Sequence, residues 1–161
     1  MNEAQLELSV MELLQQERYE YLSGDSIFRE TTDVLLKDDL RTYLINKYSS
    51  VGITPNEIES IIMGLVRAPH DPLYESNKTM LTKIIDGFVL RREDKAKKDL
   101  YVRLIDFEEP KNNIFKVVNQ FEIQGQNELR IPDAIVYING LPLVVFEFKS
   151  SVREQVNIRN A

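Results

Sequence analysis

The sequence contains no cysteine, no tryptophan and a single histidine, His70. The absence of cysteine excludes a disulfide framework and thiolate ligation of zinc. With only one histidine, a metal site has to be built mainly from carboxylate oxygens, the ligands that Mg²⁺ and Ca²⁺ prefer. His70 lies between two prolines in a loop without a neighbouring nucleophile, and we interpret it as a turn residue rather than a chemical one.

Long apolar runs are also missing. No segment approaches the ~20 apolar residues that a membrane-spanning helix requires. The first seventeen residues, MNEAQLELSVMELLQQE, are acidic and amphipathic, whereas a secretory signal is basic and then uniformly apolar. We therefore expect a cytoplasmic protein without a membrane partner.

An excess of positive charge is absent as well, because the formal net charge is −6 at pH 7. Affinity for duplex DNA comes largely from Lys and Arg side chains that neutralise phosphates, so a role on DNA would need help from partners. One basic concentration occurs between 91 and 98, interspersed with acidic residues. We interpret it as a solvated linker between a helix and a strand, in preference to a phosphate-contacting patch.

The 161 residues and a hydrophobic content of 43% predict one globular domain with its own core. Apolar residues at helical spacing predict a first helix over 4–21, closed by the turn Ser23-Gly24-Asp25, and a second over 32–47. A third helix should begin at Thr54, because Pro55 suits the first helical position and Glu57 completes a capping box. A fourth is predicted over 76–90.

The second half of the chain changes to the pattern of strands. Segments 100–107, 114–123, 134–138 and 143–148 are rich in branched and aromatic residues, and Asn139-Gly140 is typical of a tight hairpin turn. Helices followed by a four-strand meander indicate an α+β fold rather than an alternating α/β fold.

The chemistry is concentrated at the end of the last predicted strand. Glu147 and Lys149 interrupt its apolar run at positions i and i+2, so the pleat directs both side chains to the same face. A carboxylate and an ammonium are costly to bury in a central strand without compensation. A divalent cation in a hydrated cleft would provide that compensation.

Asp133 precedes Glu147 by 14 residues, across the predicted hairpin. A three-residue loop with Gly140 in the left-handed conformation would place Asp133 opposite Glu147, whereas a loop of two or four residues would place them on opposite faces. Two facing carboxylates repel unless a cation lies between them, and Mg²⁺ suits such a pair. Lys149 could then hold or help deprotonate a water for attack on a phosphodiester. The alternative is a structural Glu–Lys pair on a solvated face.

The stretch from Arg130 to Lys149 resembles the amino-terminal nuclease region of the R subunit of type I restriction-modification enzymes. The resemblance rests on Pro132-Asp133 before an apolar strand, on Asn139-Gly140-Leu141-Pro142-Leu143, and on Glu147-Phe148-Lys149. It extends to Val118-Asn119-Gln120-Phe121 and, more weakly, to Leu22-Ser23-Gly24-Asp25.

The resemblance implies a nuclease of the PD-(D/E)xK superfamily, with a restriction-endonuclease-like mixed sheet whose antiparallel meander is flanked by helices. Asp133, Glu147 and the backbone carbonyl of Phe148 would be Mg²⁺ ligands, and Lys149 would orient the attacking water. Members of the superfamily often add a carboxylate from the first helix, for which Glu7 is the candidate. The expected substrate is double-stranded DNA, and the expected partners are the methyltransferase and specificity subunits.

Two departures from the family pattern suggest an excised amino-terminal piece of a longer ATP-dependent translocase. The family's Gln-x-x-x-Tyr motif after the lysine strand is missing, and no Gly-x-x-x-x-Gly-Lys-Ser/Thr phosphate loop occurs, so ATP would be used by motor domains outside this chain. Two alternatives remain open: a stand-alone PD-(D/E)xK nuclease, and a non-catalytic module that docks partner subunits.

Overall fold

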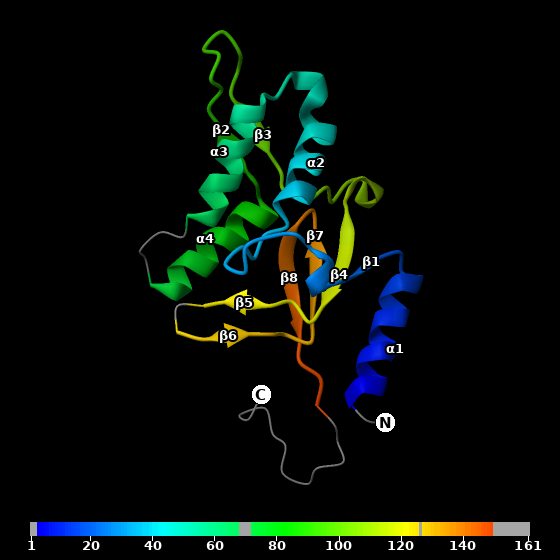
Figure 1. Ribbon diagram of the computed structural model, residues 1–161. Coiled ribbons are helices and arrows are strands. Elements are labelled where there is room, and N and C mark those ends of the chain that lie inside the picture. Colours follow the sequence, from blue (N-terminus) through cyan, green and yellow to red (C-terminus); the bar gives the residue numbers. More distant parts are fainter. Residues whose placement is uncertain (1–2, 68–71, 126, 150–161) are drawn as a thin grey trace. The chain divides into compact units, whose positions relative to one another are not determined.

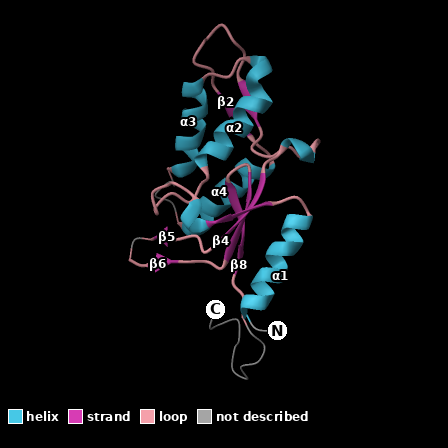
Figure 2. Cartoon of the chain, turned by 45° about the vertical axis from the view of Figure 1, so that its right-hand side comes forward, coloured by secondary structure: helices cyan, strands magenta, loops and turns pink. Residues whose placement is uncertain are grey.

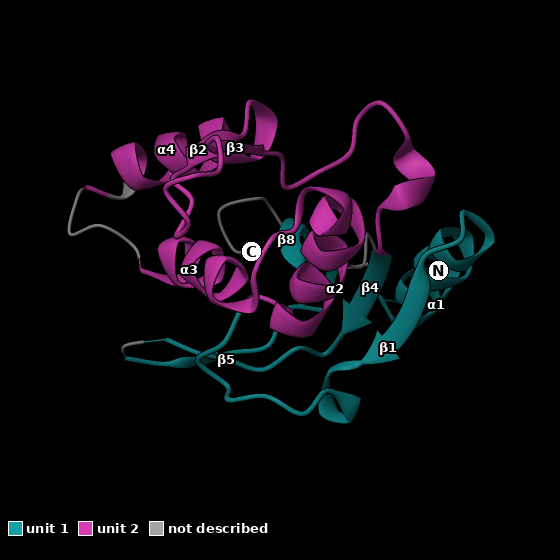
Figure 3. Ribbon diagram, turned by 90° about the horizontal axis from the view of Figure 1, so that it is seen from above, with its two compact units in different colours: residues 1–34, 115–161 teal, residues 35–114 magenta. Residues whose placement is uncertain are grey.

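The computed structural model describes residues 3–67, 72–125 and 127–149, so that His70 lies outside the described residues. The chain divides into two compact units, which Figure 3 distinguishes by colour. Unit 1 comprises Met1–Val34 and Phe115–Ala161, and unit 2 comprises Leu35–Ile114. Within the described part, no helix is long and apolar enough to cross a membrane.

Unit 1 contains a four-stranded mixed sheet with the strand order β1-β4-β7-β8 (Figure 1). β1 pairs with β4 in parallel, and β4, β7 and β8 pair antiparallel, which confirms the predicted α+β class. A separate two-stranded hairpin, β5-β6, extends from the same unit. The elements of unit 1 are α1 (Glu3–Gln16), β1 (Glu20–Ser23), the 3-10 turn η1 (Gly24–Ser26), β4 (Phe115–Asn119), β5 (Ile123–Gln124), β6 (Leu129–Arg130), β7 (Ala134–Ile138) and β8 (Leu141–Phe146).

Helix α1 covers one face of this sheet. Met11 is buried against Val117, Ala134 and Val136, and partly buried aromatic side chains from β8 and the residues after it pack against the same cluster. β7 therefore presents Ala134 and Val136 to the helix, and β4 presents Val117. This placement fixes which side chains of β7 and β8 point the other way.

The first helix ends earlier than its apolar pattern predicts. Arg18 adopts a left-handed backbone with φ 69°, and the Tyr19 N–H donates to the Leu14 carbonyl at 3.0 Å, a common way to terminate a helix. The chain then enters β1, so the predicted helix to Tyr21 is wrong. The turn at Gly24 closes this strand rather than the helix.

Unit 2 contains three helices and a short hairpin (Figure 2). The capping box predicted at Thr54 is confirmed, because the Thr54 hydroxyl accepts from the Glu57 N–H and the Glu57 carboxylate accepts from the Thr54 N–H. The elements of unit 2 are α2 (Lys37–Tyr48), η2 (Ser49–Val51), α3 (Pro55–Val66), α4 (Leu73–Ile85), β2 (Phe88–Leu90), β3 (Leu100–Val102) and η3 (Pro110–Asn112).

Two helix boundaries and one strand pairing in this region differ from the predictions. The second helix begins at Lys37 instead of Thr32. The fourth ends at Ile85, because Gly87 takes a positive φ of 82° and the following residues form β2. β3 pairs with β2 alone, so the predicted four-strand meander is wrong: only β4, β7 and β8 form it, and β1 completes the sheet.

The basic segment between β2 and β3 is partly structural. Arg92 is 4% exposed, and its Nε donates to the Glu57 carboxylate at 2.8 Å while Nη2 donates to the Gly52 carbonyl at 2.7 Å. Lys97 Nζ reaches the same carbonyl at 3.4 Å. The interpretation as a solvated linker is therefore wrong for Arg92, which joins the hairpin to the start of α3.

Candidate functional site

The hairpin between β7 and β8 brings the predicted site residues together. Ile138 pairs with Leu141, and both turn residues have positive φ, 51° at Asn139 and 78° at Gly140. This is a two-residue turn, the type that Asn-Gly favours because both positions tolerate the left-handed region. The three-residue loop expected from the sequence is therefore wrong.

A β-bulge compensates for the shorter turn. Tyr137 pairs with Pro142 but Val136 pairs with Val144, so Leu143 is an extra residue in β8. One residue fewer in the turn and one more in the strand leave the later pairing unchanged, and Ala134 lies opposite Phe146. The same register, continued one residue beyond the ladder, leads to Asp133 on one strand and Glu147 on the other, and their placement opposite each other stays a prediction.

The side chains that β7 and β8 direct toward α1 indicate which way the predicted site residues point. Ala134 and Phe146 point toward α1, and Phe148 stacks on Phe146 with ring centroids 5.7 Å apart and planes at 11°. Side chains alternate along extended backbone, so the residues between these positions point away from α1. If the pleat continues past the ends of β7 and β8, Asp133, Glu147 and Lys149 point to the opposite face, as the sequence predicts.

Asp133 is fixed to the end of β8 by a short hydrogen bond. The Phe148 N–H donates to Asp133 Oδ2 at 2.6 Å, a charge-assisted contact that takes the place of the next rung of the ladder. The carboxylate therefore lies against the residue whose carbonyl is the predicted third ligand. The second carboxylate oxygen of Asp133, Oδ1, takes no part in this hydrogen bond.

Glu147 and Lys149 are exposed, and neither side chain forms a hydrogen bond or ion pair with any residue that the structure describes. The Glu147–Lys149 ion pair required by the structural alternative is thus not formed within 127–149. Both groups are available to a ligand. A carboxylate pair on neighbouring strands with a nearby backbone carbonyl has the oxygen chemistry that suits Mg²⁺.

Glu7 occupies a different position. Its Oε1 accepts from Asn119 Nδ2 at 3.3 Å, and Asn119 shares the α1 face of β4 with Val117. Among the described residues, no group of three or more His, Cys, Asp or Glu side chains could together hold a metal ion. The structure therefore does not bring Glu7 to Asp133 and Glu147, and its role as a ligand stays a prediction.

Gln120 is a neighbour of the site that the sequence did not single out. Its backbone N–H donates to the Asp133 carbonyl at 3.1 Å, and its φ is 50°. The side chain lines a polar cavity of about 210 Å³ formed by the ends of β1 and β4. In the sequence it stood out only as part of the stretch Val118-Asn119-Gln120-Phe121, to which the family resemblance extends.

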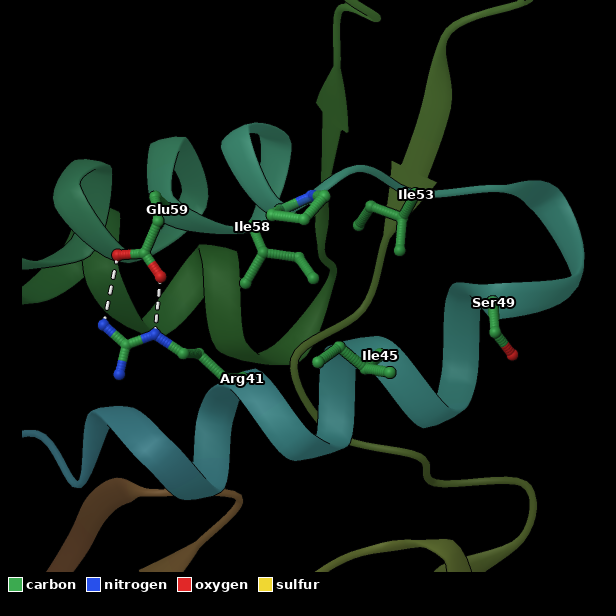
Figure 4. A pocket seen from close by; sticks show the side chains of 7 residues that line it. Arg41, Ile45, Ser49, Ile53, Ile58 and Glu59 are labelled. Carbon is green, nitrogen blue, oxygen red and sulfur yellow. Dashed lines mark hydrogen bonds and ion pairs between the residues drawn. The ribbon is translucent and has the colours of Figure 1, made fainter.

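A second cavity, of about 370 Å³, lies in unit 2 between α2 and α3 (Figure 4). Its floor is apolar, and Arg41 and Glu59 form a bidentate ion pair at one end. None of the predicted site residues lines it. The lining residues are Arg41, Ile45, Ser49, Ile53, Pro55, Ile58 and Glu59.

Comparison with known proteins finds relatives that are named as endonuclease subunits of type I restriction enzymes. The endonuclease subunit of the type I restriction enzyme HindI from Haemophilus influenzae is 29% identical over 171 aligned positions, which cover 100% of this chain and 16% of the relative. The putative type I restriction enzyme MjaIXP endonuclease subunit from Methanocaldococcus jannaschii is 43% identical over 82 residues, covering 48% of this chain and 8% of the relative.

A third relative, the type I restriction enzyme SauCOLORF180P endonuclease subunit from Staphylococcus aureus, is 28% identical over 99% of this chain and 16% of its own length. The chain thus spans a sixth or less of the relatives that it matches. The model of the family described as "Type I restriction enzyme R protein N terminus" matches residues 1–161. The chain belongs to this family of amino-terminal regions of type I restriction enzyme R proteins.

Proposed function

We propose that this chain is the nuclease part of a type I restriction enzyme and hydrolyses DNA phosphodiester bonds with Mg²⁺. The observation that carries the proposal is the register of β7 and β8, which pairs Ala134 with Phe146 and so leads directly to Asp133 and Glu147, together with the hydrogen bond from the Phe148 N–H to Asp133. Membership of the R protein family and relatives named as endonuclease subunits support the same reaction.

Asp133 and Glu147 are the residues that would hold the ion, together with the Phe148 carbonyl. Two carboxylates so placed repel each other unless a cation neutralises them, and neither forms an ion pair within the described part of the chain. The Phe148 N–H fixes the Asp133 carboxylate in position before any ligand arrives. When bound, Mg²⁺ would supply charge neutralisation at the phosphate and a more acidic water.

Lys149 acts on the attacking water in this proposal. Its ammonium donates hydrogen bonds from the same sheet face as Glu147, so it orients the water and stabilises the negative charge that develops on the phosphate. The charge on Lys149 also offsets the two carboxylates when DNA, itself an anion, approaches.

The DNA is delivered by other parts of the enzyme. The net charge of −6 disfavours tight binding of duplex DNA by this chain alone, and the relatives are about six times longer or more. We infer that ATP-driven motor domains and the methyltransferase and specificity subunits bring DNA to the site. Weak or undetectable cleavage by the isolated chain is the corresponding expectation.

Substitution of the two carboxylates tests the proposal in the enzyme that carries this chain. Asp133→Asn and Glu147→Gln should abolish cleavage of supercoiled plasmid at millimolar Mg²⁺, while ATP turnover persists. Glu12→Gln, an exposed carboxylate on α1, is the matched control and should cleave like the wild type. Cleavage at the wild-type rate by either site variant would overturn the proposal.

A further inference from the structure

The polar cavity next to Asp133 is formed by three segments of unit 1. The end of β1 and the turn after it supply one wall, the loop before unit 2 supplies the second, and the residues that follow β4 supply the third. Its lining residues are Gly24, Asp25, Ile27, Arg29, Thr31, Gln120 and Glu122. Gln120 belongs both to this cavity and, through its N–H, to the hydrogen bond with the Asp133 carbonyl.

The backbone of Gln120 is held in an unfavourable conformation. A φ of 50° is costly for a residue with a β-carbon, and such residues persist where the surrounding structure imposes them. Gly24 takes part in this, because a β-carbon at Gly24 would lie 2.4 Å from the Gln120 carbonyl oxygen. The close approach of β1 and β4 therefore fixes where the Gln120 side chain begins.

The Gln120 side chain has no structural task within the described residues. It is exposed and makes no hydrogen bond with any of them. Arg29, by contrast, is held firmly in the cavity wall: Nη1 donates to the carbonyls of Glu30 and Asp33, Nη2 donates to the Glu122 carbonyl, and the guanidinium stacks on Phe121 at 3.4 Å. Besides the acidic residues Asp25 and Glu122, the lining of the cavity thus contains the fixed guanidinium of Arg29 and the uncommitted amide of Gln120.

We propose that Gln120 positions the DNA strand that is cut, by donating a side-chain hydrogen bond to a phosphate oxygen next to the bond held at Asp133 and Glu147. Phosphates are the most frequent contacts in protein–DNA complexes, and an amide reaches one without adding charge to the site. The inference rests on the proposed nuclease function. In this proposal, the strained backbone of Gln120 directs its side-chain amide toward the DNA strand.

The test uses the enzyme that carries this chain and measures the rate of plasmid cleavage, the melting temperature and the Mg²⁺ concentration for half-maximal rate. Gln120→Gly removes the side chain and also relieves the positive φ, so the melting temperature should be unchanged or higher. Loss of a hydrogen bond to a charged group should slow cleavage by about 10- to 100-fold. The Mg²⁺ requirement should stay the same, because Gln120 does not hold the ion.

Two further variants complete the test. Gln120→Asn keeps the amide and tolerates a left-handed backbone, so it should recover part of the rate. Arg18→Gly is the matched control, because Arg18 also has a positive φ, 69°, but lies at the end of α1. It should gain stability similarly and cleave like the wild type.

The outcomes separate this inference from the nuclease proposal. If Lys149→Ala stops cleavage while Gln120→Gly cleaves at the wild-type rate, the positioning role of Gln120 is wrong and the nuclease proposal stands. If Lys149→Ala cleaves like the wild type, the nuclease proposal itself fails. A lower melting temperature for Gln120→Gly, or a slow rate that excess Mg²⁺ restores, would also contradict the positioning role.

Discussion

Two acidic residues of unit 2 and two of unit 1 have opposite surroundings. In unit 2, Glu57 and Asp106 are 2% and 6% exposed, and each is matched by a cation: Arg92 at 2.8 Å and Lys47 at 2.6 Å. In unit 1, Asp133 and Glu147 directly flank the paired residues Ala134 and Phe146, and neither pairs with a Lys or Arg within the described residues. Charge in unit 2 holds the fold together, whereas charge at the end of the unit 1 sheet remains available to a ligand.

Backbone donors reinforce this difference. Asp106 also accepts from Asn112 and from the N–H groups of Glu108 and Glu109, so its carboxylate is saturated by the chain. The Asp133 carboxylate, by contrast, accepts one hydrogen bond from the residues that the structure describes, that of the Phe148 N–H. A carboxylate whose bonds are all internal is structural, and one with an unused oxygen beside a second carboxylate is suited to a cation.

Lys149→Ala should give the largest effect and acts on function alone. In the enzyme that carries this chain, loss of a positioned ammonium should slow cleavage by about 10²- to 10⁴-fold, while ATP turnover and melting temperature are maintained. Lys78→Ala, an exposed lysine on α4, is the control and should leave the rate unchanged. A cleavage defect that merely follows unfolding would remove Lys149 from the mechanism.

Arg92→Ala should give the largest loss of stability. It leaves the buried Glu57 carboxylate without its cation, which should lower the free energy of unfolding by about 3–5 kcal/mol. Chemical denaturation measures this value, and Arg91→Ala, an exposed neighbour, should change it little. An equal, small effect of both substitutions would mean that unit 2 does not depend on its buried pair.

Acid should weaken unit 2 through the same groups. Burial alone would raise the pKa of Glu57, but hydrogen bonds from Arg92, Thr54 and Glu93 outweigh it and lower the pKa to about 2. The Lys47 hydrogen bond, followed by that from Asn112, holds the pKa of Asp106 well below its ordinary value.

Because both pKa values are depressed in the folded state, the stability they confer is present above the pKa values of the unfolded chain. It is lost as the pH falls through about 4 toward 2. Denaturation at a series of pH values should show this decline. The Glu57→Gln variant should have a lower free energy of unfolding at neutral pH, and this free energy should fall less steeply than that of the wild type as the pH is lowered. A pH profile that is as steep in Glu57→Gln as in the wild type would rule out this group as a cause.

Glu59→Ala should give the smallest effect. Glu59 pairs with Arg41 in unit 2, but the side chains are 47% and 35% exposed, so water already screens the pair. Its loss should change the free energy of unfolding by about 1 kcal/mol or less. If Glu59→Ala lowered the free energy of unfolding as much as Arg92→Ala does, the proposed difference between buried and exposed ion pairs would be wrong.

Local chemistry explains which elements could be predicted from the sequence. The capping box at Thr54 is decided within four residues, so it was predicted correctly. The fourth helix was predicted to extend too far because its apolar pattern continues past Gly87. Gly87 is the left-handed residue that terminates the helix. β1 offered no such signal, because a four-residue strand that pairs in parallel with β4 depends on residues about a hundred positions away.

The candidate site shows the same limits. Asp133, Glu147 and Lys149 were identified from spacing and resemblance, but the loop that aligns them was not: a two-residue turn and a bulge at Leu143 together give the expected register. A bulge is a property of the pairing and cannot be read from one strand. Gln120 was not selected as a site residue because its positive φ and its close approach to Gly24 arise only in the folded chain.

Calorimetric titration of Mn²⁺ into the protein that carries this chain, without nucleotide, tests the central claim most directly. The wild type should show a binding event that is lost in Asp133→Ala and in Glu147→Ala and retained in Glu12→Gln. All four proteins should melt at similar temperatures, and loss of one of two repelling carboxylates could even raise the melting temperature of the metal-free variants. Undiminished Mn²⁺ affinity in Asp133→Ala and Glu147→Ala would contradict the assignment of these residues as a shared cation site.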